Sequence, residues 1–150
     1  MTKSAPSAAA NDVDAAEMAA RLRLSTTRLA RRLRQEAGAG LTSSQLSALA
    51  VVDHHGPLTL GALAEHEGVA PPSITKVVAR LEADGLVTRH ADAVDRRVCR
   101  VTISARGAAL LAESRRRKTA WLTSRIAALD PEDRRRLASA LDVLDHLVTQ

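Results

Sequence analysis

Hydrophobic residues recur every three or four positions along most of the chain, and glycine, proline and hydroxyl residues divide this pattern into segments. Such spacing predicts amphipathic helices, and each division matches a helix start or stop. Thr42 and Gln45 fit a capping box at the start of one helix, which Gly56 and Pro57 then end. The predicted helices cover about 13–37, 43–55, 60–64, 71–84, 105–126 and 131–148.

Two segments show a different pattern, because they are rich in β-branched residues and bounded by turn-forming ones. Residues 86–89 (Leu-Val-Thr-Arg) and 98–103 (Val-Cys-Arg-Val-Thr-Ile) predict two short strands joined by the polar loop 90–97. A hairpin of this size is marginal by itself, so we expect it to pack on the helices.

Four helices, a hairpin and two further helices form the layout of a winged helix-turn-helix. We therefore predict a mainly α fold with a small β-hairpin, in which the winged helix-turn-helix covers about 41–104. The flanking helices, at about 13–38 and 105–149, are amphipathic and lack a partner inside that unit, so we expect them to dimerise two copies of the chain. Residues 12–150 then form one domain, and residues 1–11 form a disordered tail with too little apolar area to order itself.

The composition favours an acidic partner. The 150 residues include 22 Lys and Arg against 17 Asp and Glu, a formal charge of +5. There is no Phe, no Tyr and one Trp, so the chain lacks the aromatic platforms on which single-stranded nucleic acids stack, and double-stranded DNA is the better candidate. No stretch reaches the roughly 20 apolar residues of a membrane span, and the N-terminus does not resemble a signal peptide. We therefore expect a cytoplasmic protein with no membrane partner.

The residues available for an enzyme or a metal site make a weak case. Cys99 is the single cysteine, so neither an internal disulfide nor a cysteine-rich zinc site can form. Its alternation with Val101 and Ile103 predicts a structural role rather than a redox one. His54 and His55 diverge by about 100° on a helix, so they cannot face one ion, and no base and nucleophile converge on them. We predict no enzymatic activity, no metal and no cofactor.

The predicted helix 71–84 follows a short helix and a turn at Gly68, as the second helix of a helix-turn-helix does. Ile74 and Val78 predict its buried face. Its exposed positions carry side chains suited to reading base edges in the major groove, namely Ser73, Thr75, Lys76 and Arg80. The alternative is an ordinary solvated helix, and the pattern is equally typical of both.

A second charged cluster lies in and beside the hairpin loop, and comprises Asp95, Arg96, Arg97 and Arg100. An arginine at the tip of a wing can enter a narrow minor groove, where the negative potential is enhanced. A nearby aspartate can hold the guanidinium in position before binding. The alternative is a mobile charged turn without a ligand.

Over about 41–111 these residues resemble the MarR family of bacterial transcription regulators. The most specific part is Asp95-Arg96-Arg97 followed by 101–107 (Val-Thr-Ile-Ser-Ala-Arg-Gly), which is similar to the family's wing signature. Residues 63–69, followed by 73–78 and 80–89, are similar to its recognition helix and its first wing strand.

The resemblance implies a homodimer with one recognition helix per subunit in adjacent major grooves and Arg97 in the flanking minor groove. It also implies a repressor that a small phenolic or anionic ligand releases from DNA. The chain departs from the family at Ala70 and Pro71, where a serine and a polar residue are frequent, so one helix cap and one DNA contact are missing. Lys76 replaces a frequent arginine and keeps the charge without the bidentate fork.

The sequence therefore predicts a sequence-specific, double-stranded DNA-binding repressor that acts as a homodimer on an inverted-repeat operator and that a small-molecule effector releases. The alternative is a winged-helix module that binds protein with the same face and lacks sequence-specific DNA binding. An enzyme using His54 or His55 ranks last. We interpret the charge runs 115–118 and 134–136 as solvated helix faces, with contacts to phosphate or to a partner subunit as the alternative.

Overall fold

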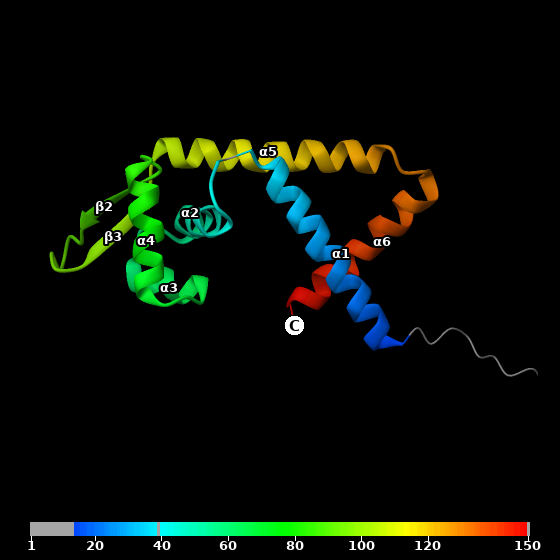
Figure 1. The fold of residues 1–150 in the computed structure, drawn as a ribbon, viewed down its shortest axis with the longest axis horizontal. Coiled ribbons are helices and arrows are strands. Elements are labelled where there is room, and N and C mark those ends of the chain that lie inside the picture. Colours follow the sequence, from blue (N-terminus) through cyan, green and yellow to red (C-terminus); the bar gives the residue numbers. More distant parts are fainter. Residues whose placement is uncertain (1–13, 39, 150) are drawn as a thin grey trace, which may run out of the picture.

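The computed structural model describes residues 14–38 and 40–149, which form six helices and a small antiparallel sheet (Figure 1). The predicted tail at 1–11 lies outside the described residues. The helices are α1 (Ala15–Glu36), α2 (Ser43–His55), α3 (Leu60–Glu67), α4 (Pro71–Ala83), α5 (Ala105–Ala127) and α6 (Pro131–Thr149). The strands are β1 (Leu58–Thr59), β2 (Val87–Ala91) and β3 (Cys99–Ile103). The mainly α fold class with its predicted order of helices is confirmed.

The sheet has three strands in the order β1-β3-β2, so the prediction of only two strands is wrong. β2 and β3 pair antiparallel, with Arg89 opposite Val101, and β1 pairs with the other edge of β3 through Leu58 and Thr59. β1 is too short to show an alternating pattern. It directly follows Pro57, and proline is typical of turns, so the sequence pattern indicated a turn here. It covers the second edge of β3, whose peptide groups would otherwise lack partners.

An aliphatic core holds α2, α3, α4, the sheet and the first turns of α5 together as one lobe. Its largest fully buried members are Leu49, Leu63, Ile74, Leu81 and Leu86. Each such side chain contributes about 1.5–3 kcal/mol by leaving water. Helix α4 turns Ile74, Val78 and Leu81 into this core from one face, so its opposite face is left to polar residues.

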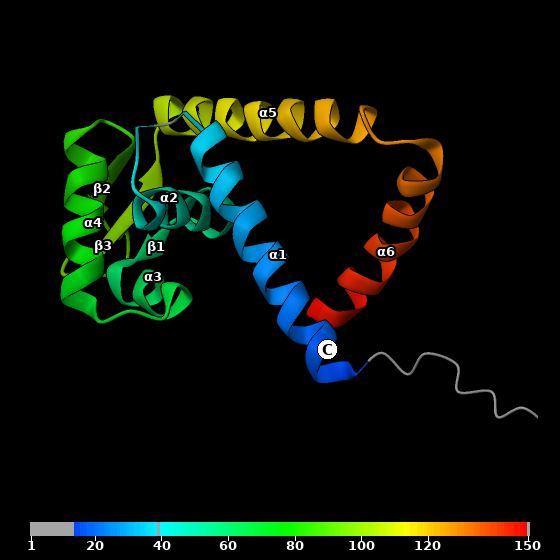
Figure 2. The same ribbon diagram turned by 45° about the vertical axis from the view of Figure 1, so that its right-hand side comes forward.

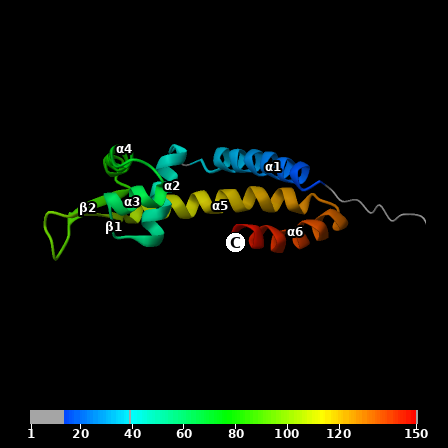
Figure 3. The same cartoon turned by 90° about the horizontal axis from the view of Figure 1, so that it is seen from below.

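The three long helices extend from this lobe and form the sides of an open triangle (Figure 2). Helix α5 links the lobe to α6, and α1 and α6 lie on either side of α5 when the molecule is seen from below (Figure 3). The guanidinium groups of Arg32 of α1 and of Arg125 lie 5.7 and 5.5 Å from the centre of the Trp121 ring of α5. The Arg32–Trp121 cation–π contact joins α1 to α5, whereas Arg125 lies on the same helix as Trp121.

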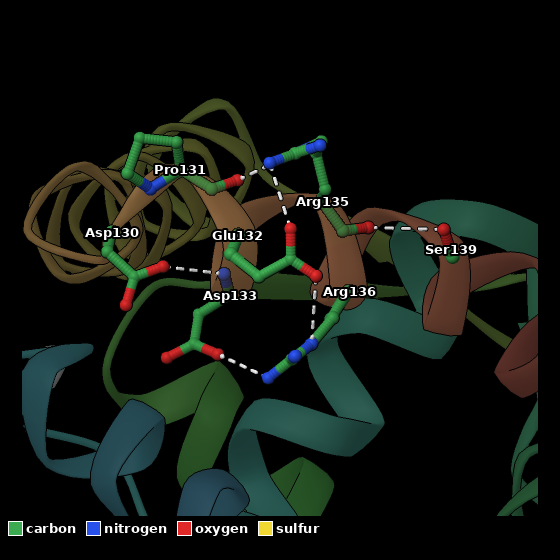
Figure 4. Close-up of polar contacts among 7 residues, drawn as sticks. All are labelled: Asp130, Pro131, Glu132, Asp133, Arg135, Arg136 and Ser139. Carbon is green, nitrogen blue, oxygen red and sulfur yellow. Dashed lines mark hydrogen bonds and ion pairs between the residues drawn. The ribbon is translucent and has the colours of Figure 1, made fainter.

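Polar groups also fix the corner between α5 and α6. Arg134 donates to the carbonyl oxygens of Ala127 and Leu129 at 3.3 and 3.1 Å, so carbonyls at the end of α5 have a charged partner. Asp130 accepts a hydrogen bond from the backbone N–H of Asp133 at 2.8 Å at the start of α6 (Figure 4). The chain therefore turns between two satisfied helix ends.

The start of α5 packs against the backbone turn that precedes β2. The Ser104 hydroxyl donates to the Gly85 carbonyl at 2.7 Å and accepts from the Gly107 N–H at 3.0 Å, and the Ser104 N–H donates to the Leu86 carbonyl at 3.0 Å. A Cβ atom on Gly107 would lie 2.2 Å from the Leu86 carbonyl oxygen. Only glycine therefore permits this approach.

We expect Gly107→Ala to lower the free energy of unfolding by about 1–3 kcal/mol, because the methyl group would collide with the Leu86 backbone. Gly61→Ala is the matched control, since its Cβ would meet only the Thr59 hydroxyl, at 3.9 Å. That variant should be neutral or up to about 1 kcal/mol more stable. Urea unfolding followed by circular dichroism measures both. Equal stability of the two variants would contradict the tight contact.

Candidate nucleic-acid interface

Helix α4 presents the four predicted groove-reading residues on its exposed side. Ser73, Thr75, Lys76 and Arg80 are all exposed. Since successive residues turn by about 100°, Lys76 lies near the middle of the exposed face, with Ser73 and Arg80 on one flank and Thr75 on the other. Ala70 is the N-cap residue of the helix and has no side-chain group that could accept a hydrogen bond there. Pro71 occupies the first helical position, where a missing N–H costs little.

The four side chains differ in how freely they can meet a ligand. The Thr75 hydroxyl donates to the Pro71 carbonyl at 2.9 Å, which leaves its methyl group and an oxygen lone pair outward. Arg80 is loosely held, since its Nε lies 3.4 Å from an Asp84 oxygen and the side chain is 70% exposed. Lys76 makes no ion pair within the described part of the chain, so its full charge faces outward.

The tip of the wing, between β2 and β3, carries two exposed arginines. Arg97 is 92% exposed, and its backbone N–H and Nε both point to one Asp95 oxygen, at 3.1 and 3.3 Å. Asp95 therefore orients the Arg97 side chain without covering it. Arg96 is exposed and has no acidic partner among residues 14–38 and 40–149.

Arg100 lies on β3, at the base of the wing, and its side chain is engaged inside the protein. Its Nε contacts an Asp92 carboxylate oxygen, and Nη1 lies 3.5 Å from the Pro57 carbonyl. The structure therefore brings Asp95, Arg96 and Arg97 together at the tip and sets Arg100 apart from them. Asp92 was not among the predicted site residues; its spacing from Asp95, typical of an aspartate that starts a turn, could have indicated it.

Helix α4 and the wing are joined by an ion pair that the sequence did not predict. Arg89 of β2 places Nε 3.0 Å from a Glu82 oxygen of α4, and the Arg89 side chain is only 25% exposed. The two residues lie seven positions apart, across a turn with Gly85 in the left-handed conformation (φ 70°). The pair holds the base of the wing against the end of α4.

The histidines do not form an active site. The rings of His54 and His55 lie edge to face at the end of α2, and His55 stacks on His66 of α3 with 4.5 Å between ring centres. Burial and the neighbouring rings of His54 and His66 lower the pKa of His55. In the described ranges, no group of three or more His, Cys, Asp or Glu residues is arranged to hold a metal ion.

Most of the arginines in the two charge runs have acidic partners in the same chain. Arg117 donates to Glu113 at 2.7 Å, and Arg115 reaches Asp53 of α2 at 3.1 Å. In α6, Glu132 forms ion pairs with Arg135 and Arg136, at 2.8 and 3.2 Å (Figure 4). The arginine side chains are exposed, as predicted for solvated faces. The pairs with Glu113 and Glu132 each lie within one helix, whereas the Arg115–Asp53 pair joins α5 to α2.

Comparison with known proteins identifies the family. The profile of the MarR family matches residues 41–99. The chain is 40% identical over 136 residues to an uncharacterized HTH-type transcriptional regulator, Mb0904, of Mycobacterium bovis. The aligned region covers 90% of this chain and 95% of the relative. A MarR family protein from Bacillus stearothermophilus superimposes with a TM-score of 0.76 at 26% identity, covering 93% of this chain and 99% of that one. A Staphylococcus aureus MepR mutant bound to an oligodeoxyribonucleotide shares the fold, with a TM-score of 0.70 at 19% identity over 87% of this chain and 97% of that one.

The chain therefore belongs to the MarR family of transcriptional regulators, with the winged helix-turn-helix fold of that family. The resemblance noted in the sequence is confirmed. The relatives are regulators of transcription and not enzymes, which confirms the prediction of no enzymatic activity. Among the described helices, none combines the length and the apolar character needed to cross a membrane.

Proposed function

We propose that the protein is a sequence-specific repressor that binds double-stranded DNA as a homodimer on an inverted repeat. The observation that carries this proposal is that one lobe carries both the exposed Lys76 face of α4 and the exposed Arg97 at the tip of the wing. Figure 1 shows α4 beside the β2–β3 hairpin. An α-helix fits the major groove, and an arginine on a projecting loop fits the minor groove beside it. The Glu82–Arg89 ion pair links these two elements.

The roles of the individual residues follow from their chemistry. Lys76 reaches guanine acceptors or phosphate, Ser73 offers a hydroxyl, and the Thr75 methyl group suits the methyl group of thymine. Arg80 can exchange its weak pairing with Asp84 for a phosphate. Arg96 and Arg97 are the wing contacts. The DNA-bound MepR structure, which has the same fold, supports this use of the lobe.

The helices outside the lobe support a dimer. Neither α1 nor α6 buries any residue in the single chain. Both leave large apolar side chains exposed: Met18, Leu24, Leu29, Leu141, Val143, Leu147 and Val148. A second copy of the chain would remove this apolar area from water. A two-fold dimer places two copies of α4 in a symmetric arrangement, which matches an inverted repeat with half-sites about one helical turn apart.

Selection of duplexes from a random library, followed by titration at several salt concentrations, tests the central proposal. The expected result is enrichment of an inverted repeat that the protein binds far more tightly than random DNA. No enrichment, together with weak binding that falls steeply with salt, would favour the alternative of a winged-helix module that binds protein. A deletion of the gene then shows the direction of control, because loss of a repressor raises transcription from the selected site.

The wing assignment predicts the effect of Arg97→Ala. Removing a minor-groove arginine should weaken binding to the selected operator by about 1–3 kcal/mol, or roughly five- to 150-fold. Arg116→Ala is the matched control, because it removes the same charge from an exposed arginine that pairs with Glu113 on α5. Fluorescence anisotropy with labelled operator measures both. Equal affinities of the two variants would remove Arg97 from the interface.

The dimer predicts the effect of a charge on the outer helices. Leu147→Asp places a carboxylate on the exposed apolar face of α6, where Leu147 is 58% exposed, and should shift the protein to monomers. Val94→Asp is the control, since Val94 is 96% exposed on the wing, far from these helices in the fold. Sedimentation velocity measures the masses. A Leu147→Asp protein that stays dimeric would exclude this face of α6 from the interface.

We further propose that a small anionic effector releases the repressor from DNA. A cavity of about 180 Å³ lies where the end of α1 meets the start of α2, and Arg34, Gly38, Thr42 and Leu46 are among its lining residues. A ligand there would contact both a long outer helix and the helix-turn-helix lobe, so it could change their relation. Arg34 supplies the positive charge.

This effector proposal is tested with a set of small aromatic carboxylates, using benzoate as the first probe. At least one should lower operator affinity, and Arg34→Gln should abolish this response while leaving affinity without the probe unchanged. Arg31→Gln, on the same helix but outside the cavity lining, should respond normally. A response that survives in Arg34→Gln would place the effector elsewhere, and no response to any carboxylate would remove release by an anion from the proposed function.

A further inference from the structure

Asp92 organises the turn of the wing, although it lies before the charged tip. One carboxylate oxygen, Oδ1, accepts hydrogen bonds from the backbone N–H groups of Val94 and Asp95, at 2.8 and 3.1 Å. The backbone N–H of Asp92 donates to the Val98 carbonyl at 2.8 Å, which closes the loop across its base. The first residues of the wing turn are therefore folded around one carboxylate.

The other oxygen of this carboxylate, Oδ2, is held by Arg100 of β3. The Asp92 side chain is 13% exposed and that of Arg100 is 38% exposed, so the pair is partly shielded from water. The Arg100 guanidinium, together with the Asp95 and Val94 N–H groups, lowers the pKa of Asp92 to about 2. Asp92 is thus ionised near neutral pH, and its hydrogen bonds are charge-assisted.

Arg100 also connects the wing to the helix-turn-helix. Its Nη1 lies 3.5 Å from the carbonyl oxygen of Pro57, just before β1, and its backbone pairs with Thr59 of β1 on one side and His90 of β2 on the other. The contacts therefore run in a continuous series from the α2–α3 connection, through Arg100 and Asp92, to the N–H of Asp95, whose carboxylate in turn orients Arg97.

We infer that Asp92 and Arg100 are positioning residues for Arg97, and that Arg100 acts through this series rather than by touching DNA. The inference rests on the proposed function, since it assigns a task within that interface. A wing loop held before binding avoids the ordering cost that a flexible loop would add to association. The Arg100 charge is already neutralised by Asp92, so it contributes little to the salt dependence of binding, in contrast to Arg96, which is free to meet a phosphate.

The first test needs no DNA. Asp92→Asn and Arg100→Gln keep the size of each side chain and remove its charge. Both variants should speed amide hydrogen exchange at Val94 and Asp95 while leaving exchange in the α2–α4 core unchanged. Arg116→Gln is the control and should alter neither. Unchanged exchange at Val94 and Asp95 in both variants would overturn the inference.

The second test is a double-mutant cycle on the selected operator. Arg100→Gln alone should weaken binding about tenfold, because the wing loop would then have to become ordered when it binds DNA. In the Arg97→Ala background it should weaken binding less than twofold, because the residue it positions is gone. A full tenfold loss in both backgrounds, with a salt slope smaller by about one charge, would make Arg100 a direct phosphate contact and overturn the inference.

The two tests separate this inference from the proposed function. If the unmodified protein selects no duplex while Asp92→Asn and Arg100→Gln still speed exchange at the wing, the Asp92–Arg100 anchor stands and the proposed function falls. If operator binding is specific but the exchange rates do not change, the proposed function stands and the anchor falls.

Discussion

The close approach of α5 to the turn between α4 and β2 is the contact on which the arrangement of the whole molecule depends. Ser104 satisfies two carbonyls of that turn, and Gly107 allows the helix axis to come nearer than any side chain would permit. Because α5 is continuous from this point to the far corner, the contact sets the direction in which the outer helices leave the lobe. Helix α4 ends in the same turn, so its direction is coupled to that of α5.

The lobe and the outer helices are stabilised by different means. The lobe has a compact aliphatic core, with side chains such as Leu49 and Leu63 removed completely from water. The outer helices have caps, local ion pairs and the Trp121 contacts, but little burial in the single chain. Local ion pairs on exposed helices contribute only about 0.2–1 kcal/mol each. Under the proposed function, this division assigns DNA binding to the lobe, which has the buried core, and dimerisation to the helices whose apolar side chains are still exposed.

The helices were predictable from the sequence because nearby residues along the chain determine where helices begin. Thr42 and Gln45 form the expected capping box, Thr59 and Ser104 cap their helices, and Pro71 stands in the first turn of α4. The strand β1 was not predictable, because two residues carry no period and their pairing with β3 is set by the tertiary fold.

The same limit applies to the candidate site. The exposed face of α4 followed from the spacing of Ile74 and Val78, and the Asp95–Arg97 contact joins near neighbours. The contacts of Arg100 with Asp92 and of Arg89 with Glu82 cross between elements, so a pattern along the chain does not reveal them. The sequence predicted Arg100 as one of the wing residues. Only the folded structure shows that its guanidinium group is paired with the Asp92 carboxylate.

The corner at Arg134 and Asp130 gives α5 a second consequence. With both ends of this helix held, its 23 residues make a strut of about 34 Å at 1.5 Å per residue. Adding or removing one residue would move the DNA-binding lobe by about 1.5 Å and also rotate it by about 100° around the strut. Distance and orientation therefore cannot be varied independently. If the protein binds two half-sites as proposed, a change in their spacing could be followed only by an insertion in α5 close to a whole number of helical turns.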